Sequence, residues 1–412
     1  MRKVGLIIFL FSIIILWNAY AYFKEIKNND NNIIYFNSEK NISSNSATVS
    51  NSLILDLKHF CDSIYSFRNY NKIFNGALVI AYKDSIIFQR CEGYRDYKTK
   101  IPVDNQSFFE LASASKPITA TAILLAYEKK YLSIYDSVSK FIPDFPYPDV
   151  TIFHLLTHRS GLPEYFYFCD HYISDKKKYI SNSDVIQTMI KNKIYPYYKP
   201  NKRFKYCNTN YVLLASIIEI SSGKNFKDFV RREIFEKIGE NEIYFFDELQ
   251  CDSIKIKKTT GYYRNGKEYV PLYLNGVYGD KGIYLTPIGL YKFLRALDKG
   301  ELISDSLKYL AWNENYNEIK NKHTYALGWR IYFDNNRKIV YHTGKWNGFK
   351  SLAVILPEIE IYAVFLSNNY RSYGFLVEDF SILADFINQY KILNRVLYNE
   401  DYNLNGNNFK SF

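Results

Sequence analysis

The sequence predicts an α+β fold, an α/β sandwich whose antiparallel sheet is built from N- and C-terminal strands, is flanked by helices and carries an inserted, mainly helical lobe. Three observations lead to this prediction. Strand-like segments occur near the start of the chain and through its last third, and segments with helical periodicity lie between them. Hydrophobic residues also make up 47% of the 412 residues, which suffices for a large packed core and excludes wholesale disorder.

The expected strands are short segments rich in β-branched and aromatic residues, bounded by turn residues. Near the N-terminus, Lys83 and Asp84 form the turn of a hairpin. Near the C-terminus, Pro357 and Glu358 separate the last two strands. The strands are expected at residues 77–82, 85–88, 326–333, 338–342, 351–356 and 361–367.

The expected helices show apolar residues at helical spacing. The folded domain is predicted to begin near residue 52, where such a spacing starts, and to close with a helix near residues 376–387. The apolar positions of these two outer helices are Leu53, Leu57, Phe60 and Ile64, and Leu376, Phe380, Leu383 and Ile387. Inner helices are expected near residues 115–130, 184–191, 209–222 and 287–298.

The N-terminus has the pattern of an export signal. Arg2 and Lys3 precede an apolar run that ends at Trp17, and Ala19-Tyr20-Ala21 then offers an A-x-A cleavage site. An uncleaved membrane anchor is the alternative, because about 20 largely apolar residues can span a bilayer. Both interpretations predict an exported protein of the periplasm or cell envelope. In the second, the N-terminal segment holds it at the inner membrane.

The domain organisation follows from these patterns. Residues 1–23 are expected to be the signal peptide or anchor, and residues 24–51 a polar, Asn- and Ser-rich linker. Residues 52–399 form the folded domain, and residues 400–412 a polar tail.

The net charge of +11 excludes little by itself. A basic protein can bind an anionic partner, but Lys, Asn, Ile, Tyr and Phe are abundant together here, as AT-rich codons favour. No dense stripe of Lys and Arg is present, so nucleic acid is not an expected partner. The five cysteines contain no C-x-x-C pair, and we expect small buried thiols at Cys61, Cys91, Cys169, Cys207 and Cys251.

Ser113 and Lys116 are the first candidates for chemistry. They are three residues apart, so they share one face of a helix. A serine hydroxyl needs a base to become a nucleophile, and a buried lysine amine can be that base. Free N–H groups at a helix start can also stabilise an oxyanion. The pair alone is weak evidence, because a capping serine followed by an exposed lysine has the same sequence.

Two further motifs strengthen the case. Tyr206-Cys207-Asn208 precedes a helical stretch, and His342-Thr343-Gly344 ends a strand-like segment. In this order and at these separations, the three motifs resemble the serine β-lactamase and penicillin-binding-protein superfamily. The branch that contains class C β-lactamases, D-alanyl-D-alanine carboxypeptidases and related esterases is the most similar. Flanking segments at residues 109–113, 151–163, 279–286, 327–329 and 348–349 fit as well, and the resemblance extends over roughly residues 55–390.

The resemblance implies a two-step acyl transfer. Ser113 would attack a carbonyl group and become acylated, and water would then release the product. Lys116 and Tyr206 would transfer the protons of the nucleophile and the leaving group, and which of the two is the general base is left open. Asn208 would bind the amide of the substrate or hold Lys116. No metal or organic cofactor is required.

The strand motif is expected to border the substrate. His342, Thr343 and Gly344 are predicted to bind it, and the backbone N–H groups of Ser113 and Lys345 are predicted to form the oxyanion hole. Many β-lactamases have a lysine at the position of His342, and a histidine is mostly neutral at pH 7. This difference favours a peptidase or an esterase over an efficient β-lactamase.

Four other residues are candidates for a role near the site. Trp346 is expected to wall the acyl pocket or to offer a stacking face. Glu164 is interpreted as a surface-loop carboxylate in preference to a deacylating base. His154 and His158 lie four residues apart, but a third metal ligand is not evident, and the resemblance implies that His158 orders a loop.

The predicted function is therefore that of a serine hydrolase acting through an acyl-enzyme on an amide or ester. D-amino-acid peptides of the cell wall are the candidate substrates, as for a D-alanyl-D-alanine carboxypeptidase. The alternatives are a broad-specificity esterase, a β-lactamase, and a non-catalytic penicillin-binding or sensor module. The expected partners are a small-molecule or peptide substrate and peptidoglycan, with membrane association through the N-terminal segment.

Overall fold

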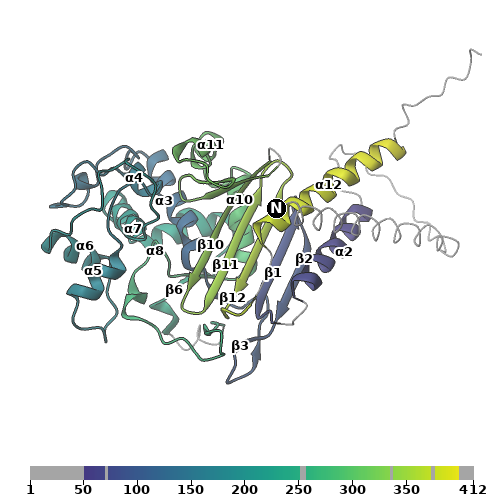
Figure 1. The fold of residues 1–412 in the computed structure, drawn as a ribbon, viewed down its shortest axis with the longest axis horizontal. Helices are drawn as coiled ribbons and strands as arrows, with labels where there is room; N and C mark the ends of the chain where they lie inside the picture. The colour runs from purple at the N-terminus through teal and green to yellow at the C-terminus, as the bar shows by residue number, and fades with distance from the viewer. Residues whose placement is uncertain (1–50, 70–72, 251–256, 335–336, 373–375, 399–412) are drawn as a thin grey trace, which may run out of the picture. The chain divides into compact units, whose positions relative to one another are not determined.

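A computed structural model describes residues 51–69, 73–250, 257–334, 337–372 and 376–398 (Figure 1). The predicted signal peptide or anchor, the polar linker up to residue 50, the polar tail and Cys251 lie outside these residues. Among the helices of the described part, none is long and apolar enough to cross a membrane.

The centre of the fold is a seven-stranded antiparallel sheet in the order β2-β1-β12-β11-β10-β9-β8. Two strands come from the N-terminal part and five from the C-terminal part, so the predicted fold class is confirmed. The strands are β1 (Gly76–Tyr82), β2 (Ser85–Glu92), β8 (His323–Tyr325), β9 (Arg330–Asp334), β10 (Arg337–Trp346), β11 (Phe349–Leu356) and β12 (Ile361–Ser367).

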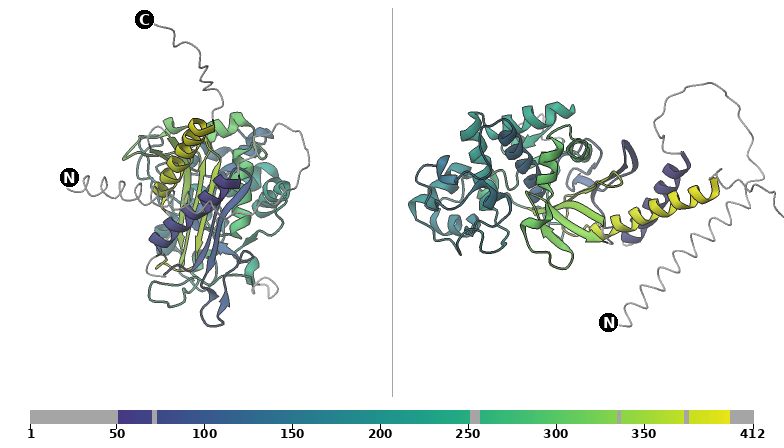
Figure 2. Two further views of the ribbon diagram at one scale, coloured as in Figure 1. Left: turned by 90° about the vertical axis from the view of Figure 1, so that its right-hand side faces the viewer. Right: turned by 90° about the horizontal axis from the view of Figure 1, so that it is seen from above.

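The first and the last strand of this sheet in chain order are neighbours. β1 pairs with β12 along its whole length, from Gly76 opposite Ser367 to Tyr82 opposite Ile361. Every residue of both strands is buried, as expected for strands covered on both faces. Helix α10 (Pro287–Asp298) packs against β1, β11 and β12. Helix α2 (Asn51–Arg68) packs against β2 and α12 (Val377–Tyr398), and Figure 2 shows α2 and α12 across one face of the sheet.

The inserted lobe is mainly helical, as predicted. Its central helix is buried over residues 209–218 and contacts four of the other helices. This central helix is α7 (Thr209–Ser222), and its neighbours are α3 (Lys116–Glu128), α4 (Ile152–Leu156), α6 (Asn182–Lys191) and α8 (Phe226–Val230). Helix α5 (Tyr165–Tyr172) packs on α6, and α11 (Asp305–Ala311) precedes β8.

Two small sheets complete the described part of the fold. One pairs β3 (Tyr94–Asp96) with β4 (Ile101–Pro102). The other has the order β5-β7-β6, with β5 (Phe109–Glu110), β7 (Ile283–Leu285) and β6 (Tyr244–Phe245). Strand β5 of the second sheet lies one residue before the short 3-10 helix η1 (Ala112–Ser115). The pairing of β5 therefore fixes the segment that leads to Ser113.

Three details of the prediction were wrong. The strand expected at residues 326–333 begins only at Arg330, as β9, because residues 326–329 form a turn in which Gly328 has a φ of +80°. In α2, the buried positions beyond Leu57 are Cys61 and Tyr65, whereas Phe60 and Ile64 are half-buried. Leu376 precedes α12 and is 51% exposed.

Candidate active site

Ser113 and Lys116 lie at the junction between η1 and α3. Lys116 is the first residue of α3, and its Nζ lies 3.1 Å from Ser113 Oγ. Ala112, just before the serine, has a φ of +49°, a strained conformation for a residue with a side chain. Such strain is typical of functional sites, where the surrounding structure holds a reactive side chain in place.

The ammonium group of Lys116 is fully buried and is held by neutral groups. Besides the serine oxygen, it donates to Asn208 Oδ1 at 2.7 Å and to the carbonyl oxygen of Asp280 at 2.9 Å. The rings of Tyr206 and Tyr211 lie 4.9 Å and 5.5 Å from it. These contacts direct the lysine nitrogen at Ser113, and they bring together the first two predicted motifs.

His158 contacts the loop that carries Tyr206 and Asn208 and holds it in place. The backbone N–H of Cys207 donates to His158 Nδ1 at 3.1 Å. The His158 ring also packs on the Tyr206 ring, with their centroids 4.3 Å apart. Burial lowers the pKa of His158 well below its usual range, so the ring is neutral and can accept this hydrogen bond. His158 thus orders a loop, as expected.

Glu164 holds the same loop from a second side, and its interpretation as a surface carboxylate was wrong. Its Oε2 accepts hydrogen bonds from both the backbone N–H and the side-chain amide of Asn208, at 2.9 Å and 3.0 Å. Its Oε1 is buried and has no hydrogen-bond partner among the described residues. Burial raises the pKa of Glu164 to about 7. The two hydrogen bonds turn the amide so that Asn208 Oδ1 faces Lys116.

The third motif lies on the part of β10 that does not pair with β9. β9 pairs with β10 only as far as Tyr341, and η1 packs beside the strand beyond it. Gly344 makes this approach feasible. A Cβ atom there would collide with the Leu111 carbonyl and the Ser351 hydroxyl, and would lie 3.0 Å from the backbone nitrogen of Ser113. The strand therefore passes directly alongside the predicted nucleophile.

His342 lies beneath the site and Thr343 faces outward. The His342 ring is fully buried, with Nε2 3.2 Å from the Tyr325 hydroxyl. Burial and the nearby Arg330 and Lys116 hold the pKa of His342 well below its usual range, so it carries no charge at neutral pH. Thr343 is exposed and available to a substrate, whereas His342 supports the strand.

The cation at this end of the site is Arg330, a residue that the sequence analysis missed. Its guanidinium lies 5.3 Å from the centroid of the Tyr206 ring and 5.8 Å from that of Tyr325. Its Nε has no hydrogen-bond partner among the described residues. The sequence carried one signal, since Arg330 directly follows the Leu327-Gly328-Trp329 segment. Its position over Tyr206 depends on the pairing of β9 with β10.

Trp346 is the last residue of β10, two positions after Gly344. Its ring stacks on Phe166 with centroids 5.3 Å apart, and the buried ammonium of Lys281 lies 5.2 Å from it. His154 lies apart from the catalytic motifs, since its Nδ1 accepts the Thr151 N–H at the start of α4. Among the described residues, no group of His, Cys, Asp and Glu side chains could hold a metal ion.

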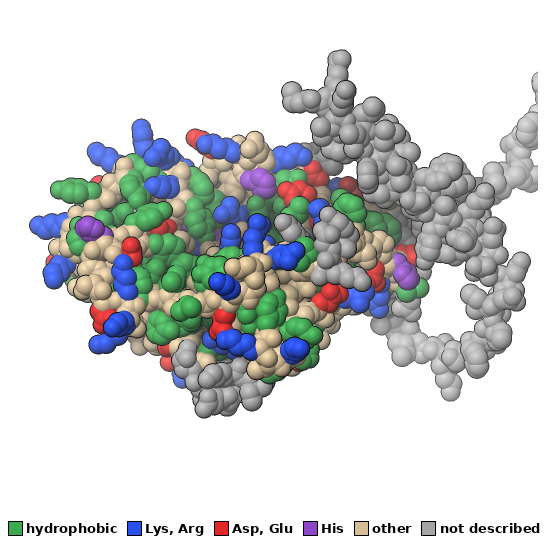
Figure 3. Space-filling model, turned by 60° about the horizontal axis from the view of Figure 1, so that its bottom comes forward, with side chains coloured by type: hydrophobic (Ala, Val, Ile, Leu, Met, Phe, Trp, Pro, Cys, Tyr) green, Lys and Arg blue, Asp and Glu red, His purple; other side chains and the backbone are tan. Residues whose placement is uncertain are grey.

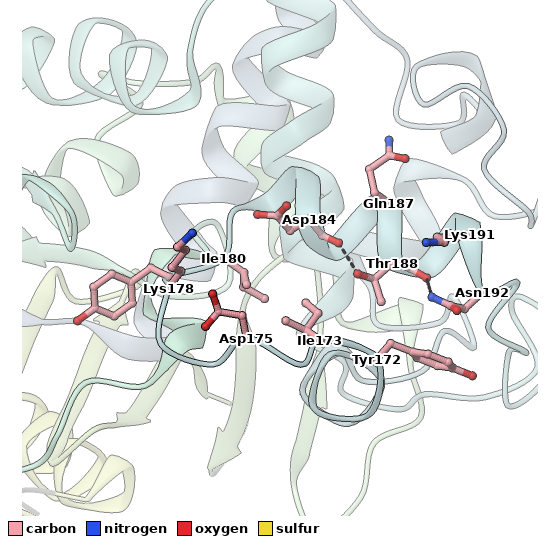
Figure 4. A pocket seen from close by; sticks show the side chains of 11 residues that line it. Tyr172, Ile173, Asp175, Lys178, Ile180, Asp184, Gln187, Thr188, Lys191 and Asn192 are labelled. Atoms are coloured by element: carbon pink, nitrogen blue, oxygen red, sulfur yellow. Dashed lines mark hydrogen bonds between the residues drawn. The ribbon is translucent and has the colours of Figure 1, made fainter.

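A separate pocket of about 480 Å³ lies in the helical lobe between the end of α5 and α6 (Figure 4). Tyr172, Asp175, Thr188 and Lys191 are among the side chains that line it. None of the predicted site residues contributes to this pocket, so it is not the catalytic site.

The sheet, the helical lobe and the convergence of the three motifs define a protein of the β-lactamase and penicillin-binding-protein superfamily. The chain belongs to the β-lactamase family, whose model matches residues 66–385. Family and relatives together indicate a hydrolase.

Two relatives and one solved structure illustrate this membership. The chain is 33% identical to penicillin-binding protein 4* of Bacillus subtilis over 72% of this chain and 68% of the relative. It is 26% identical to teichoic acid D-alanine hydrolase of Staphylococcus aureus over 58% and 57%, so it spans little more than half of that protein. A penicillin-binding protein from Bacillus halodurans has the same fold, with a TM-score of 0.67 at 24% identity, covering 79% of this chain and 98% of that one.

Proposed function

We propose that this protein is a serine hydrolase of the cell envelope that cleaves a D-alanyl amide or ester through an acyl-enzyme, with Ser113 as the nucleophile. The observation that carries the proposal is the contact between Lys116 Nζ and Ser113 Oγ at 3.1 Å, inside a buried cluster that also contains Asn208. Penicillin-binding and D-alanine hydrolase functions among the relatives support the substrate class.

In the first step, Ser113 Oγ attacks the carbonyl carbon of the substrate and its proton leaves. Lys116 in its neutral form accepts this proton through the contact between its Nζ and Ser113 Oγ. The Tyr206 ring lies next to the lysine, and we assign to its hydroxyl the transfer of a proton to the leaving group. A water molecule then attacks the acyl-enzyme, and the same two side chains carry the proton back.

The negative charge that develops on the carbonyl oxygen needs donors. We assign this role to the backbone N–H groups of Ser113 and Lys345. The close approach of Gly344 to the Ser113 nitrogen supports the assignment, because it brings the two backbones side by side. Thr343 is exposed on the same stretch of strand and is assigned to substrate binding.

Arg330 favours a substrate with a free carboxylate. His342 is neutral and buried, so it cannot supply the positive charge that a lysine would supply in its place. The Arg330 guanidinium lies close to Tyr206, and a guanidinium can bind a carboxylate at the end of a peptide. A D-alanyl-D-alanine carboxypeptidase activity is therefore the favoured form of the function, and an esterase activity is the second candidate.

The experiment compares a peptide ending in D-Ala-D-Ala with the same peptide carrying a C-terminal amide. For the wild type, we expect a higher kcat/KM on the free acid. For Arg330→Gln, we expect a loss of about tenfold on the free acid and little change on the amide. Equal turnover of the two peptides by the wild type would leave an esterase as the better description, and p-nitrophenyl esters would then test that activity.

A further inference from the structure

A second buried lysine lies close to the catalytic cluster and is paired with a carboxylate. Asp280 and Lys281 follow each other directly before β7, and their side chains are 1% and 3% exposed. Lys281 Nζ lies 3.7 Å from Asp280 Oδ1. The Lys, Arg, Asp and Glu side chains visible in Figure 3 lie at the surface, where water and salt screen their charges. The buried pair lacks this screening, so its charges act more strongly on their neighbours.

Hydrogen bonds hold the pair in place. Lys281 Nζ donates to the carbonyl oxygens of Leu274 and Val277, at 2.9 Å and 3.0 Å. It also donates to the Tyr165 hydroxyl at 2.9 Å, and this hydroxyl donates to Asp280 Oδ2 at 3.2 Å. Tyr165 therefore bridges the lysine and the carboxylate. Since an ammonium group has three protons to donate, these contacts fix the direction of the Lys281 side chain.

The backbone of Asp280 connects this pair to the catalytic lysine. Its carbonyl oxygen accepts a hydrogen bond from Lys116 Nζ at 2.9 Å, whereas its carboxylate lies against Lys281. The acceptors of Lys116 in the described part of the chain are therefore all neutral, although one of them belongs to an aspartate. Burial lowers the pKa of Lys281, and the positive charge of Lys116 lowers it further. The two lysines are thus close enough to influence each other's protonation.

Other titratable groups face the two lysines. Glu110 raises the pKa of Lys281, but burial raises the pKa of Glu110 itself to about 7. Glu164 faces Lys116, and burial likewise raises its pKa to about 7. Both carboxyl groups are increasingly protonated below about pH 7, so Asp280 supplies the carboxylate that is in ion-pair contact with Lys281. Two tyrosines and two neutral histidines also face Lys116, namely Tyr206, Tyr211, His158 and His342.

We propose that Lys281 is a positioning residue for catalysis, which neutralises the Asp280 carboxylate and thereby keeps Lys116 able to act as a base. The inference rests on the proposed function, in which Lys116 accepts the proton of Ser113. While Lys281 is present, the carboxylate is compensated and favours the ammonium form of Lys116 only weakly. Without Lys281, the carboxylate is uncompensated and a like charge is also lost, so Lys116 holds its proton to a higher pH.

The pH dependence of phosphonylation tests this inference without a natural substrate. The second-order rate constant for labelling of the full chain by a fluorophosphonate is recorded from about pH 5 to about pH 10, and the midpoint of its acid limb is determined. All variants are built in a Glu164→Gln parent, so that the titration of Glu164 does not contribute. Lys281→Gln retains an amide donor but carries no charge, and we expect it to raise the midpoint by about one pH unit.

A lysine that only supports the loop would give a different result. Its replacement would change the rate at every pH and leave the midpoint in place. A midpoint that Lys281→Gln does not raise would therefore overturn the inference. Glu110→Gln is the matched control, because it removes the other carboxyl group that acts on Lys281. It is expected to leave the midpoint unchanged, and a rise equal to that of Lys281→Gln would also overturn the inference.

Asp280→Asn assigns the effect to the carboxylate. The asparagine keeps the shape of the side chain but carries no charge. Added to Lys281→Gln, it is expected to return the midpoint toward that of the parent, and a double variant that keeps the full rise would contradict the role of Asp280. Asp280→Asn alone is expected to leave the midpoint unchanged or to lower it. This test holds even if Lys281→Gln alone does not fold, since a rise in Asp280→Asn would overturn the inference.

The labelling also separates this inference from the proposed function. If neither the wild type nor the Glu164→Gln parent reacts with the fluorophosphonate at any pH, the proposed function fails and the inference fails with it. If the parent reacts and its acid limb is the same in Lys281→Gln, the inference alone fails.

Discussion

Glu164→Gln is the substitution that most sharply separates stability from activity in this protein. The pKa of Glu164 is raised from 4.5 to about 7, mainly by burial. The nearby Asp280 raises the pKa further, whereas Lys116 and the two Asn208 hydrogen bonds lower it. The folded state therefore prefers the protonated carboxyl group, and its stability falls as the pH rises from about 4.5 to about 7.

The magnitude follows from the size of this shift. A change of about 2.5 pH units corresponds to about 3 kcal/mol at a pH above both values. A glutamine cannot ionise, and its amide oxygen can still accept both hydrogen bonds from Asn208. We therefore expect Glu164→Gln to be more stable than the wild type by up to about 3 kcal/mol at about pH 8, and to be nearly equal to it at about pH 4.5.

Activity is expected to change in the opposite direction. A carboxylate accepts hydrogen bonds more strongly than a neutral amide oxygen, so the glutamine holds Asn208, and through it Lys116, less firmly. We expect kcat/KM to fall by about tenfold, which corresponds to about 1.4 kcal/mol. The part of the pH–rate profile that belongs to Glu164, near pH 7, is expected to disappear.

Urea unfolding at the two pH values and a pH–rate profile on one substrate measure these effects. Glu110→Gln is the matched control, because Glu110 is also buried, its pKa is also raised to about 7, and it hydrogen-bonds Tyr284 instead of the catalytic loop. We expect it to retain the pH dependence of the wild-type activity. A Glu164→Gln variant that is less stable at about pH 8, or that keeps the wild-type rate and profile, would refute the reasoning.

Three further substitutions test the catalytic cluster. Gly344→Ala would place a methyl group against the Leu111 carbonyl and the Ser351 hydroxyl, so we expect a loss of about 3 kcal/mol in stability by urea unfolding, together with slower labelling by a fluorophosphonate. A variant as stable and as reactive as the wild type would show that the strand does not need to pass so close. Lys116→Ala is expected to slow acylation by about 10²-fold or more in stopped-flow measurements, and near-wild-type rates would exclude it as the base. Tyr206→Phe retains the ring that faces Lys116 but lacks the hydroxyl, and we expect kcat to fall by about 10²-fold. An unchanged kcat would remove Tyr206 from proton transfer.

Much of the fold was predictable because local patterns coincided with the tertiary structure. Helices α7 and α10 and strand β12 begin and end at the predicted residues, since each has a strong apolar pattern and clear boundary residues. The prediction of a strand at residues 326–333 was wrong in its first half, because a turn lies within a segment of apolar and aromatic residues. Gly328 packs there against Ala120 of α3, a contact between segments about 200 positions apart.

In the site, too, local sequence patterns were predictable and contacts between distant segments were not. The three motifs were recognised as a set, and the structure brings Ser113, Lys116 and Asn208 into hydrogen-bond contact. The roles of Glu164 and Arg330 were not predictable. Glu164 follows a proline in what reads as a surface loop, and only the packing of this loop against the start of α7 buries it. Arg330 faces Tyr206 because of strand pairing with β10, which no local pattern specifies.

The central claim is that Ser113 is a nucleophile, and covalent labelling tests it most directly. The wild type and Ser113→Ala are each treated with a fluorophosphonate, and the intact mass and the modified peptide are measured. We predict a single phosphonyl adduct on Ser113 in the wild type and none in the variant. A wild type that remains unmodified, or an adduct that persists in Ser113→Ala, would contradict the claim.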